Sequence, residues 1–306
     1  MQRRAFLTAA LAIPAIRRAA AQAALPAVAS FSILGDLVRQ VAGERRLALT
    51  ILVGPDADAH DFQPRPSDAE RLRGAALLVR NGLGFDDWLR RLTGAAGFGG
   101  TSVTASDGVT PRPAGEERRH DHGARRDAGP SRDPHAWGDP RNIPLYLRNI
   151  VSGLSAADPG NAALYARNAE AASARSLALD AECRAAFAAV PEARRKVLTS
   201  HDAFGYFGAA YGIRFLAPQG VSTHAEPSAA GVAALIRQVR AEGITAVFLE
   251  NMANPATLER LAREAGVRVG GRLYSDSLSP PDGPAPTYEA LIRHNTGLLV
   301  PAMRGA

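Results

Sequence analysis

Short apolar runs alternate with helix-like segments in two stretches of the chain. In the first stretch, runs with β-branched residues predict strands at 47–53, 76–79 and 101–105, and helices are predicted at 67–74 and 85–94. In the second stretch, strands are predicted at 196–200, 214–217, 245–250 and 267–273, with helices at 203–211, 228–241 and 255–265. A helix thus lies between successive strands in both stretches.

This alternation is typical of parallel sheets covered by helices on both faces. We therefore predict an α/β protein with two Rossmann-like lobes, an N-terminal lobe at 24–158 and a C-terminal lobe at 191–306. Between them, residues 161–190 are rich in Ala and contain no Pro or Gly. One helix of that length would extend roughly 45 Å and would serve as a long rigid linker over 159–190. Two shorter helices with an unmarked break are the alternative.

The segment 111–133 fits neither stretch. It contains many charged residues, Gly and Pro, and almost nothing apolar, so we expect a mobile surface loop. His120 and His122 lie within it. They are candidates for an accessory role in gathering metal. The alternative is that they are ordinary polar residues of a solvated loop.

The first 23 residues have the pattern of an export signal. Paired arginines, Arg3 and Arg4, precede an apolar run that ends near Ile16, and small residues suited to cleavage follow at 21–23. The pair favours the twin-arginine route, and the run is too short to span a bilayer, which takes roughly 20 residues. We expect a signal peptide at 1–23 and a periplasmic protein.

Removal of that peptide changes the charge of the protein. The whole chain has a formal net charge of +6, and residues 1–23 hold four arginines and no acid, which leaves +2 on the mature chain. This small excess does not indicate binding to nucleic acid. Cys183 is the only cysteine, so the chain forms no internal disulfide and any metal must be bound by nitrogen and oxygen ligands.

Isolated polar residues follow several of the predicted strands. His60 comes after strand 47–53, His201 after 196–200 and Asp276 after 267–273, while His135 lies between the charged segment and a helix. The carboxyl ends of parallel strands face one crevice, so we expect these side chains to converge there, two from each lobe. Three imidazoles and a carboxylate suit tetrahedral Zn²⁺, and Mn²⁺ or Co²⁺ would bind the same ligands more weakly.

The chain resembles the metal-specific solute-binding proteins of bacterial ABC transporters, the zinc and manganese cluster. The resemblance covers nearly the whole mature chain. It rests on Gly-Pro-Asp-Ala-Asp-Ala-His-Asp-Phe-Gln-Pro at 54–64, Asp-Pro-His-Ala-Trp at 133–137, Thr-Ser-His-Asp-Ala-Phe-Gly-Tyr at 199–206 and Glu-Pro-Ser at 226–228. It implies that His60, His135, His201 and Asp276 are the metal ligands.

The resemblance further implies two lobes joined by a long rigid helix, with the metal between them, and delivery of the metal to a membrane permease. Manganese-preferring relatives often carry Glu where His201 stands, so the histidine favours zinc. We expect a monomer, with loading by a periplasmic metal chaperone as an open question. Asp202 and Glu250 lie near ligand-bearing loops and are candidates to orient imidazole N–H groups.

Two other classes of function are alternatives to a binding protein. A zinc hydrolase would need an open coordination position and a general base, and no His-Glu-x-x-His, Gly-x-Ser-x-Gly or phosphate-binding Gly-Lys motif is present. A third hypothesis is a zinc-storage protein or an adhesin with the same fold. If the protein is a metal-binding protein, protonation of the histidines should weaken metal binding as pH falls through roughly 6.5.

Overall fold

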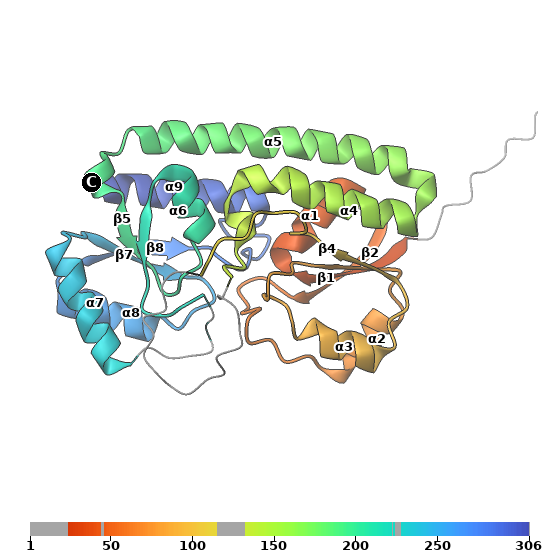
Figure 1. The fold of residues 1–306 in the computed structure, drawn as a ribbon, viewed down its shortest axis with the longest axis horizontal. Coiled ribbons are helices and arrows are strands. Elements are labelled where there is room, and N and C mark those ends of the chain that lie inside the picture. The colour runs from red at the N-terminus through yellow and green to blue at the C-terminus, as the bar shows by residue number, and fades with distance from the viewer. Residues whose placement is uncertain (1–23, 44–45, 115–131, 222, 224–227, 306) are drawn as a thin grey trace, which may run out of the picture.

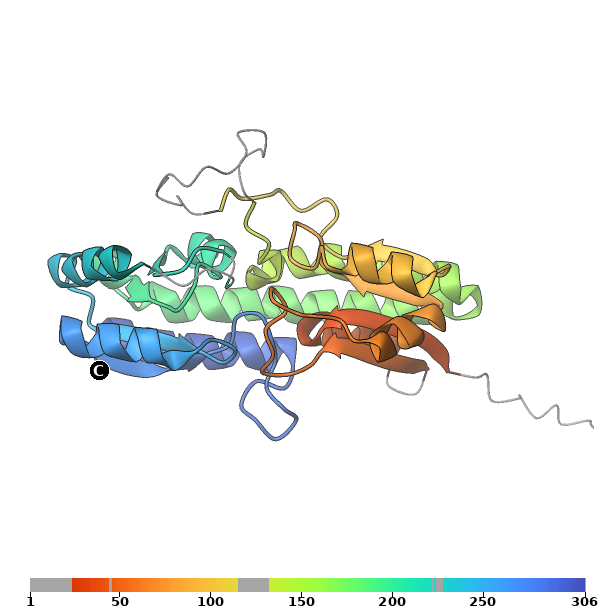
Figure 2. The same ribbon diagram turned by 90° about the horizontal axis from the view of Figure 1, so that it is seen from below.

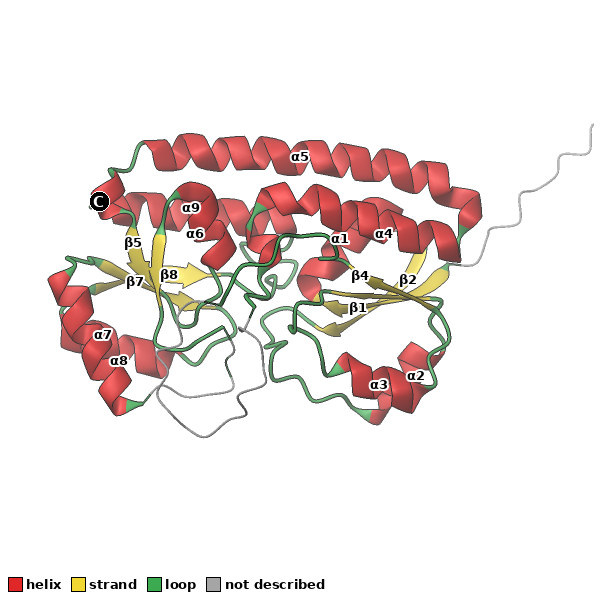
Figure 3. Ribbon diagram, in the orientation of Figure 1, coloured by secondary structure: helices red, strands yellow, loops and turns green. Residues whose placement is uncertain are grey.

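The computed structural model describes residues 24–43, 46–114, 132–221, 223 and 228–305. Two four-stranded parallel sheets lie at opposite ends of an elongated molecule, with one long helix running along both (Figure 1). This arrangement confirms the α/β fold class with two lobes. Both predicted stretches of strands form the sheets, and β1 and β8 point toward the opposite lobe (Figure 3). The export signal predicted at 1–23, together with His120 and His122, lies outside the described residues.

The N-terminal lobe has the strand order β2-β1-β3-β4. Its elements are β1 (Leu25–Phe31), α1 (Ser32–Ala42), β2 (Leu47–Val53), α2 (Pro66–Arg73), β3 (Leu77–Arg80), α3 (Leu89–Ala96) and β4 (Thr101–Thr104). The sequence analysis assigned neither β1 nor α1. The β1 strand is central, paired with both β2 and β3, and its residues from Ala27 to Phe31 are buried. Its small residues fit a strand covered on both faces.

The C-terminal lobe has the matching order β6-β5-β7-β8. Its elements are β5 (Lys196–Leu198), α6 (Gly205–Tyr211), β6 (Arg214–Leu216), α7 (Ala229–Ala241), β7 (Ala246–Glu250), α8 (Pro255–Ala265), β8 (Arg268–Leu273) and α9 (Tyr288–Arg304). The observed strands and helices from β5 to β8 fall within the predicted segments, which are longer by up to two residues at an end, whereas no segment was predicted for α9. The apolar periodicity therefore located this lobe well.

After α4 (Ile143–Ala157), which packs on α1 and β4 of the N-terminal lobe, the long helix α5 (Ala162–Ala188) joins the two lobes. α5 is one continuous helix of 27 residues, and the alternative of two broken helices is wrong. Its buried residues recur every three or four positions and so form one face: Tyr165, Ala169, Ala172, Ser176, Leu179, Cys183 and Phe187. That face packs on α1 and α4 of one lobe and on α6 and α9 of the other (Figure 2). Such packing along its whole length makes α5 a stiff connector.

Two separate apolar cores are present among the described residues. The larger core runs through both lobes and includes the sheet residues Phe31 and Phe248. The smaller core lies where α7 and α8 pack on the C-terminal sheet, around Val239, Val247 and Leu261. The outer helices of the C-terminal lobe are thus packed independently of the larger core.

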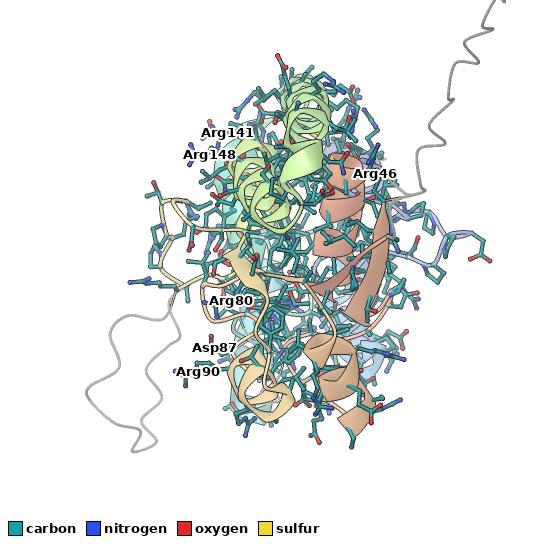
Figure 4. All side chains as sticks on the ribbon, turned by 90° about the vertical axis from the view of Figure 1, so that its right-hand side faces the viewer. Arg46, Arg80, Asp87, Arg90, Arg141 and Arg148 are labelled. Carbon is teal, nitrogen blue, oxygen red and sulfur yellow. The ribbon has the colours of Figure 1, made fainter. Side chains whose placement is uncertain are left out.

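Figure 4 views the N-terminal lobe end-on with its side chains drawn, and Arg46, Arg80 and Arg141 are among those that it labels. Each of these arginines has a partner: Arg46 donates to Asn161, Arg80 to Thr104, and Arg141 to Asp139. No helix within the described part of the chain combines the length and the apolar character needed to cross a membrane.

The two ends of the segment predicted as a mobile loop at 111–133 are described, and they pair with each other. Pro113 and Arg132 form an antiparallel bridge, and the Asp133 amide donates to the Arg112 carbonyl at 3.0 Å. Asp133 is buried, so its assignment to a mobile surface loop at 111–133 is wrong. The polar composition of this segment concealed a carboxyl group that is anchored inside the protein.

Candidate metal centre

Four predicted residues come together between the lobes. His60 lies in the loop after β2, His135 precedes a 3₁₀ turn at Ala136–Gly138, and His201 and Asp276 follow β5 and β8. One potential ligand atom from each lies within 4.8 Å of the others. The side chains of His135, His201 and Asp276 are at most 1% exposed, and that of His60 is 6% exposed. We call these residues the His/Asp set.

The spacing of the donor atoms fits a metal ion. His60 Nε2 and His201 Nε2 lie 3.2 and 3.1 Å from Asp276 Oδ2, and His135 Nε2 lies 3.4 Å from Asp276 Oδ1. The two N-lobe imidazoles have their Nε2 atoms 3.2 Å apart. Ligands at roughly 2.1 Å from a tetrahedral zinc ion would be about 3.4 Å from one another. The observed distances between donor atoms are close to this ligand-to-ligand spacing.

Direct hydrogen bonding does not account for this clustering. Both Asp276 carboxylate oxygens and His201 Nε2 are buried without an aligned hydrogen-bond partner among the described residues. Buried polar atoms that lack a partner cost free energy. A cation among these closely spaced atoms would satisfy their lone pairs, so the arrangement fits a bound metal.

On the C-lobe side, Glu250 at the end of β7 supports the set. Its Oε1 accepts hydrogen bonds from the backbone amides of Ser200 and His201, at 2.8 and 2.9 Å. Its Oε2 lies 2.7 Å from His201 Nδ1 and accepts a hydrogen bond from Ser275 Oγ at 2.6 Å. Glu250 therefore fixes the His201 ring and also contacts the residue preceding Asp276, an arrangement that orients metal-binding imidazoles in proteins.

On the N-lobe side, each histidine is held by an aspartate two residues earlier. Asp133 Oδ1 accepts from the His135 amide at 2.9 Å and lies 2.8 Å from His135 Nδ1. Asp58 Oδ1 accepts from the His60 amide at 2.8 Å. The sequence analysis missed both aspartates. The repeated Asp-x-His spacing at 58–60 and 133–135 is the signal that could have found them.

Asp202, the other candidate for orienting an imidazole, has a different known environment. Its backbone amide donates to the Gly220 carbonyl at 3.1 Å, and the residue lines an open groove at the start of α6. Both ring nitrogens of its neighbour His201 face other carboxylates, from Glu250 and Asp276. A role for Asp202 in orienting an imidazole stays a prediction.

Aromatic rings enclose the N-lobe half of the set. The Phe85 ring packs edge-on against His60 with centroids 4.6 Å apart, and Trp137 packs against His135 at 5.3 Å. The Trp137 indole also donates to the Ser275 carbonyl at 2.9 Å, across the lobe interface. These rings cover the N-lobe side of the set and pack against both of its imidazoles.

Burial and charge shift the pKa values of the His/Asp set in different directions. Burial lowers the pKa of His135, but attraction to Asp276 and the contact with Asp133 outweigh it and raise the value to about 9. For His201, Glu250 and Asp276 likewise outweigh burial and raise the pKa. Burial lowers the pKa of His60. The pKa of Asp276 is held well below its usual range because the attraction of His135 and His201 outweighs burial. In the metal-free protein, protons thus partly occupy the place of a cation.

An iron-binding protein, YfeA of Yersinia pestis, is 31% identical over 268 residues, covering 87% of this chain and 82% of YfeA. A manganese-binding lipoprotein, MntA of Halalkalibacterium halodurans, is 30% identical over 276 residues, covering 90% and 87%. The solved periplasmic zinc-binding protein TroA of Treponema pallidum superposes with a TM-score of 0.82 at 27% identity, covering 91% and 99%.

The two-lobed fold and the His/Asp set define a substrate-binding protein for a metal ion, a component of an ABC transporter rather than an enzyme. A family model described as zinc-uptake complex component A, periplasmic, matches residues 27–302. The chain belongs to this family, ZnuA. Its similar proteins are named for iron, manganese and zinc, so family membership establishes a divalent metal and not which one.

Proposed function

We propose that this protein binds Zn²⁺ in the periplasm through His60, His135, His201 and Asp276 and delivers it to the membrane permease of an ABC transporter. The observation that carries the proposal is the convergence of three imidazoles and one carboxylate at distances close to those of a tetrahedral shell. A closed set of nitrogen and oxygen ligands suits storage of an ion during transport.

Zinc is favoured by the ligand types. Three neutral imidazoles and a single carboxylate form a compact, nitrogen-rich shell, whereas Mn²⁺ prefers more oxygen ligands. Zinc also binds such sites more tightly than manganese in the usual affinity order. Manganese is the second candidate, because a similar protein is named for it. Iron is named for another, YfeA.

The remaining parts of the proposal concern export and organisation. We propose that residues 1–23 direct export by the twin-arginine route, and that 24–158 and 191–306 are lobes joined by a linker at 159–190. The protein would act as a monomer, and a periplasmic chaperone could load it. His120 and His122 would at most assist in gathering metal.

Elemental analysis of protein purified from its own export compartment tests the choice of metal. Zinc should be bound at about one ion per chain, and added Mn²⁺ in large excess should not displace it. Recovery of manganese or iron in the native protein, retained against added zinc, would reject zinc as the cargo. Equilibrium titration of the metal-free protein with each ion then ranks the affinities.

A further inference from the structure

The carboxylate of Asp276 is held differently from the rings of His135 and His201. Each of those rings places Nδ1 against a carboxylate outside the His/Asp set, at 2.8 Å from Asp133 and 2.7 Å from Glu250. Neither oxygen of Asp276 has an aligned hydrogen-bond partner within the part of the chain that the structure describes. Its close contacts, at 3.1–3.4 Å, are with the three histidines. The direction of this carboxylate therefore depends on the backbone that carries it.

The backbone directly before Asp276 is held from both lobes. From the C-terminal lobe, Asn295 of α9 bonds both the amide and the carbonyl of Tyr274, at 2.9 and 2.6 Å. From the N-terminal lobe, the Trp137 indole N–H donates to the Ser275 carbonyl at 2.9 Å. That carbonyl belongs to the peptide unit between Ser275 and Asp276, and a peptide unit is planar. Trp137 therefore fixes the plane of the peptide that leads into the ligand.

Trp137 has little freedom to follow a displacement of that carbonyl. Its residue is 2% exposed, and its ring packs against Phe31 and Phe85 with centroids 5.0 and 4.8 Å apart. Its own carbonyl accepts a hydrogen bond from the Tyr288 hydroxyl at 2.9 Å. Tyr288 begins α9 and is itself bonded to the N-terminal lobe, because its amide donates to Asp36 of α1 at 2.9 Å. One turn of the N-terminal lobe is thus bonded to two segments of the C-terminal lobe.

The same indole contacts a metal-binding residue of its own lobe. Its ring packs against His135 with centroids 5.3 Å apart, and His135 Nε2 lies 3.4 Å from Asp276 Oδ1. Trp137 therefore touches one N-lobe ligand with its ring and fixes the backbone of one C-lobe ligand with its N–H. Because hydrogen bonds weaken steeply when distance or angle changes, this bond is sensitive to the position of one lobe relative to the other.

We propose that Trp137 is a positioning residue for metal binding, which sets the direction of Asp276 through the Ser275 carbonyl and so ties Asp276 to His135 across the lobe interface. The inference rests on the proposed function, since it takes both residues as ligands. With the N–H in place, the carboxylate stays at the spacing that a tetrahedral ion requires. Without the N–H, the peptide can rotate and the carboxylate turns away from the ion. Tyr288 acts one step further back, by holding Trp137.

Zinc titration of the full chain carrying Trp137→Phe tests this proposal. The substitution keeps an aromatic ring beside His135 and removes the N–H. We expect zinc affinity to fall about tenfold, the lower end of the range for groups that support metal ligands.

Trp88→Phe is the matched control, because it makes the same change at the other tryptophan of the chain. The buried Trp88 indole also donates to a backbone carbonyl, that of Ala59 at 3.0 Å, but it does so inside the N-terminal lobe. Asp58 still accepts the amide of the neighbouring His60, so zinc affinity should stay within about twofold of the unaltered protein.

Tyr288→Phe keeps the test decisive if Trp137→Phe does not fold, because it removes a single hydroxyl. Zinc affinity should fall about threefold as the turn that carries Trp137 loosens. Its control is Tyr165→Phe, at another buried tyrosine, whose hydroxyl donates to Asp158 at 2.6 Å. That bond lies at the α4–α5 junction, at the outer end of the N-terminal lobe (Figure 1). Both tyrosine variants should lower the thermal stability of the metal-free protein, and Tyr165→Phe should leave zinc affinity unchanged.

The visible spectrum of Co²⁺ bound in place of zinc separates positioning from general stability. Tetrahedral Co²⁺ absorbs strongly in the visible range, and its bands weaken when the ligand geometry departs from a tetrahedron. Trp137→Phe and Tyr288→Phe should weaken these bands at saturating Co²⁺. The two control variants should leave the spectrum unchanged.

Equal zinc affinities in Trp137→Phe and Trp88→Phe, or in Tyr288→Phe and Tyr165→Phe, would overturn the proposal. So would a loss of zinc affinity in Trp137→Phe with an unchanged cobalt spectrum, since the ligand geometry would then not depend on the N–H. Failure of the unaltered protein to bind Zn²⁺ would instead reject the proposed function, and the two failures are thereby distinguished.

Discussion

The two lobes share one strand order but support their metal-binding residues differently. In the C-terminal lobe, Glu250 connects the ends of β5, β7 and β8 through the amides of Ser200 and His201 and the hydroxyl of Ser275. In the N-terminal lobe, each histidine depends on an aspartate only two residues away. The C-lobe half is thus fixed by a network between distant residues, and the N-lobe half by local turns. Loss of a residue from the C-lobe network should therefore lower metal affinity more than loss of an N-lobe aspartate.

The largest effect is expected at Asp276, the residue that all three histidines face. Asp276→Ala removes a ligand and the carboxylate nearest to the Nε2 atoms of the three imidazoles, so zinc affinity should fall by more than the ten- to hundredfold typical of supporting residues. Competition titration against a chelator measures this loss of zinc affinity. Retention of affinity within about threefold would show that Asp276 is not a ligand.

Substitutions at Glu250 and Asp133 compare directly how the C-terminal and N-terminal lobes hold their metal-binding histidines. Glu250→Gln should lower zinc affinity about fiftyfold and Asp133→Asn about tenfold, within the range seen for groups that orient metal-bound imidazoles. Glu264→Gln, which breaks an exposed ion pair with Arg260 on α8, is the matched surface control and should have no effect. Equal losses at Glu250 and Asp133 would contradict the proposed difference between the lobes.

The affinity for zinc should depend on pH above neutrality. His135, with its pKa raised to about 9, and His201 bind protons that a metal must displace, whereas His60, with its lowered pKa, adds little. Affinity should therefore rise about tenfold per pH unit for each displaced proton from pH 7 toward 9. This window lies higher than the one expected from unperturbed histidine.

Calorimetric titration in buffers of different ionisation enthalpy counts the released protons. At pH 7 we expect at least one proton per zinc ion. Binding without proton release, and with constant affinity between pH 7 and 9, would show that the imidazoles are neutral in the metal-free protein.

The smallest effect concerns the contact between the lobes at Gly205, the first residue of α6. A Cβ atom there would overlap Asp133 Oδ2, so Gly205→Ala should displace the carboxylate that orients His135 and weaken zinc binding about threefold. Gly94→Ala in α3 meets nothing within 4 Å and is the matched control. It should leave binding unchanged and stabilise the protein by about 0.5–1 kcal/mol. Equal zinc affinities in the two variants would show that the close contact between Gly205 and Asp133 does not affect zinc binding.

Much of the fold follows from apolar periodicity, since a strand buried on both faces and an Ala-rich helix have distinct patterns. The missed β1 shows the limit: its Ala, Pro and Ser residues give weak local preference, and pairing with both neighbours makes it a strand. The long helix was predictable because no Gly or Pro interrupts it.

The ligand candidates were predictable because strand ends in parallel sheets converge. The residues that hold these ligands in place were harder to predict. Glu250 was a candidate by position, but its bonds to Ser200 and Ser275 arise from strand neighbours far apart in sequence. Asp133 was assigned to the wrong environment because its charged neighbours suggested solvent, while the Pro113–Arg132 bridge that anchors its segment joins residues 19 positions apart.

X-ray absorption spectroscopy at the zinc edge of the loaded protein tests the central claim most directly. The account predicts four ligands at roughly 2.0–2.2 Å, all nitrogen or oxygen, with the multiple-scattering signature of three imidazoles. A site with fewer than three imidazoles, or a shell of six mostly oxygen ligands, would contradict it.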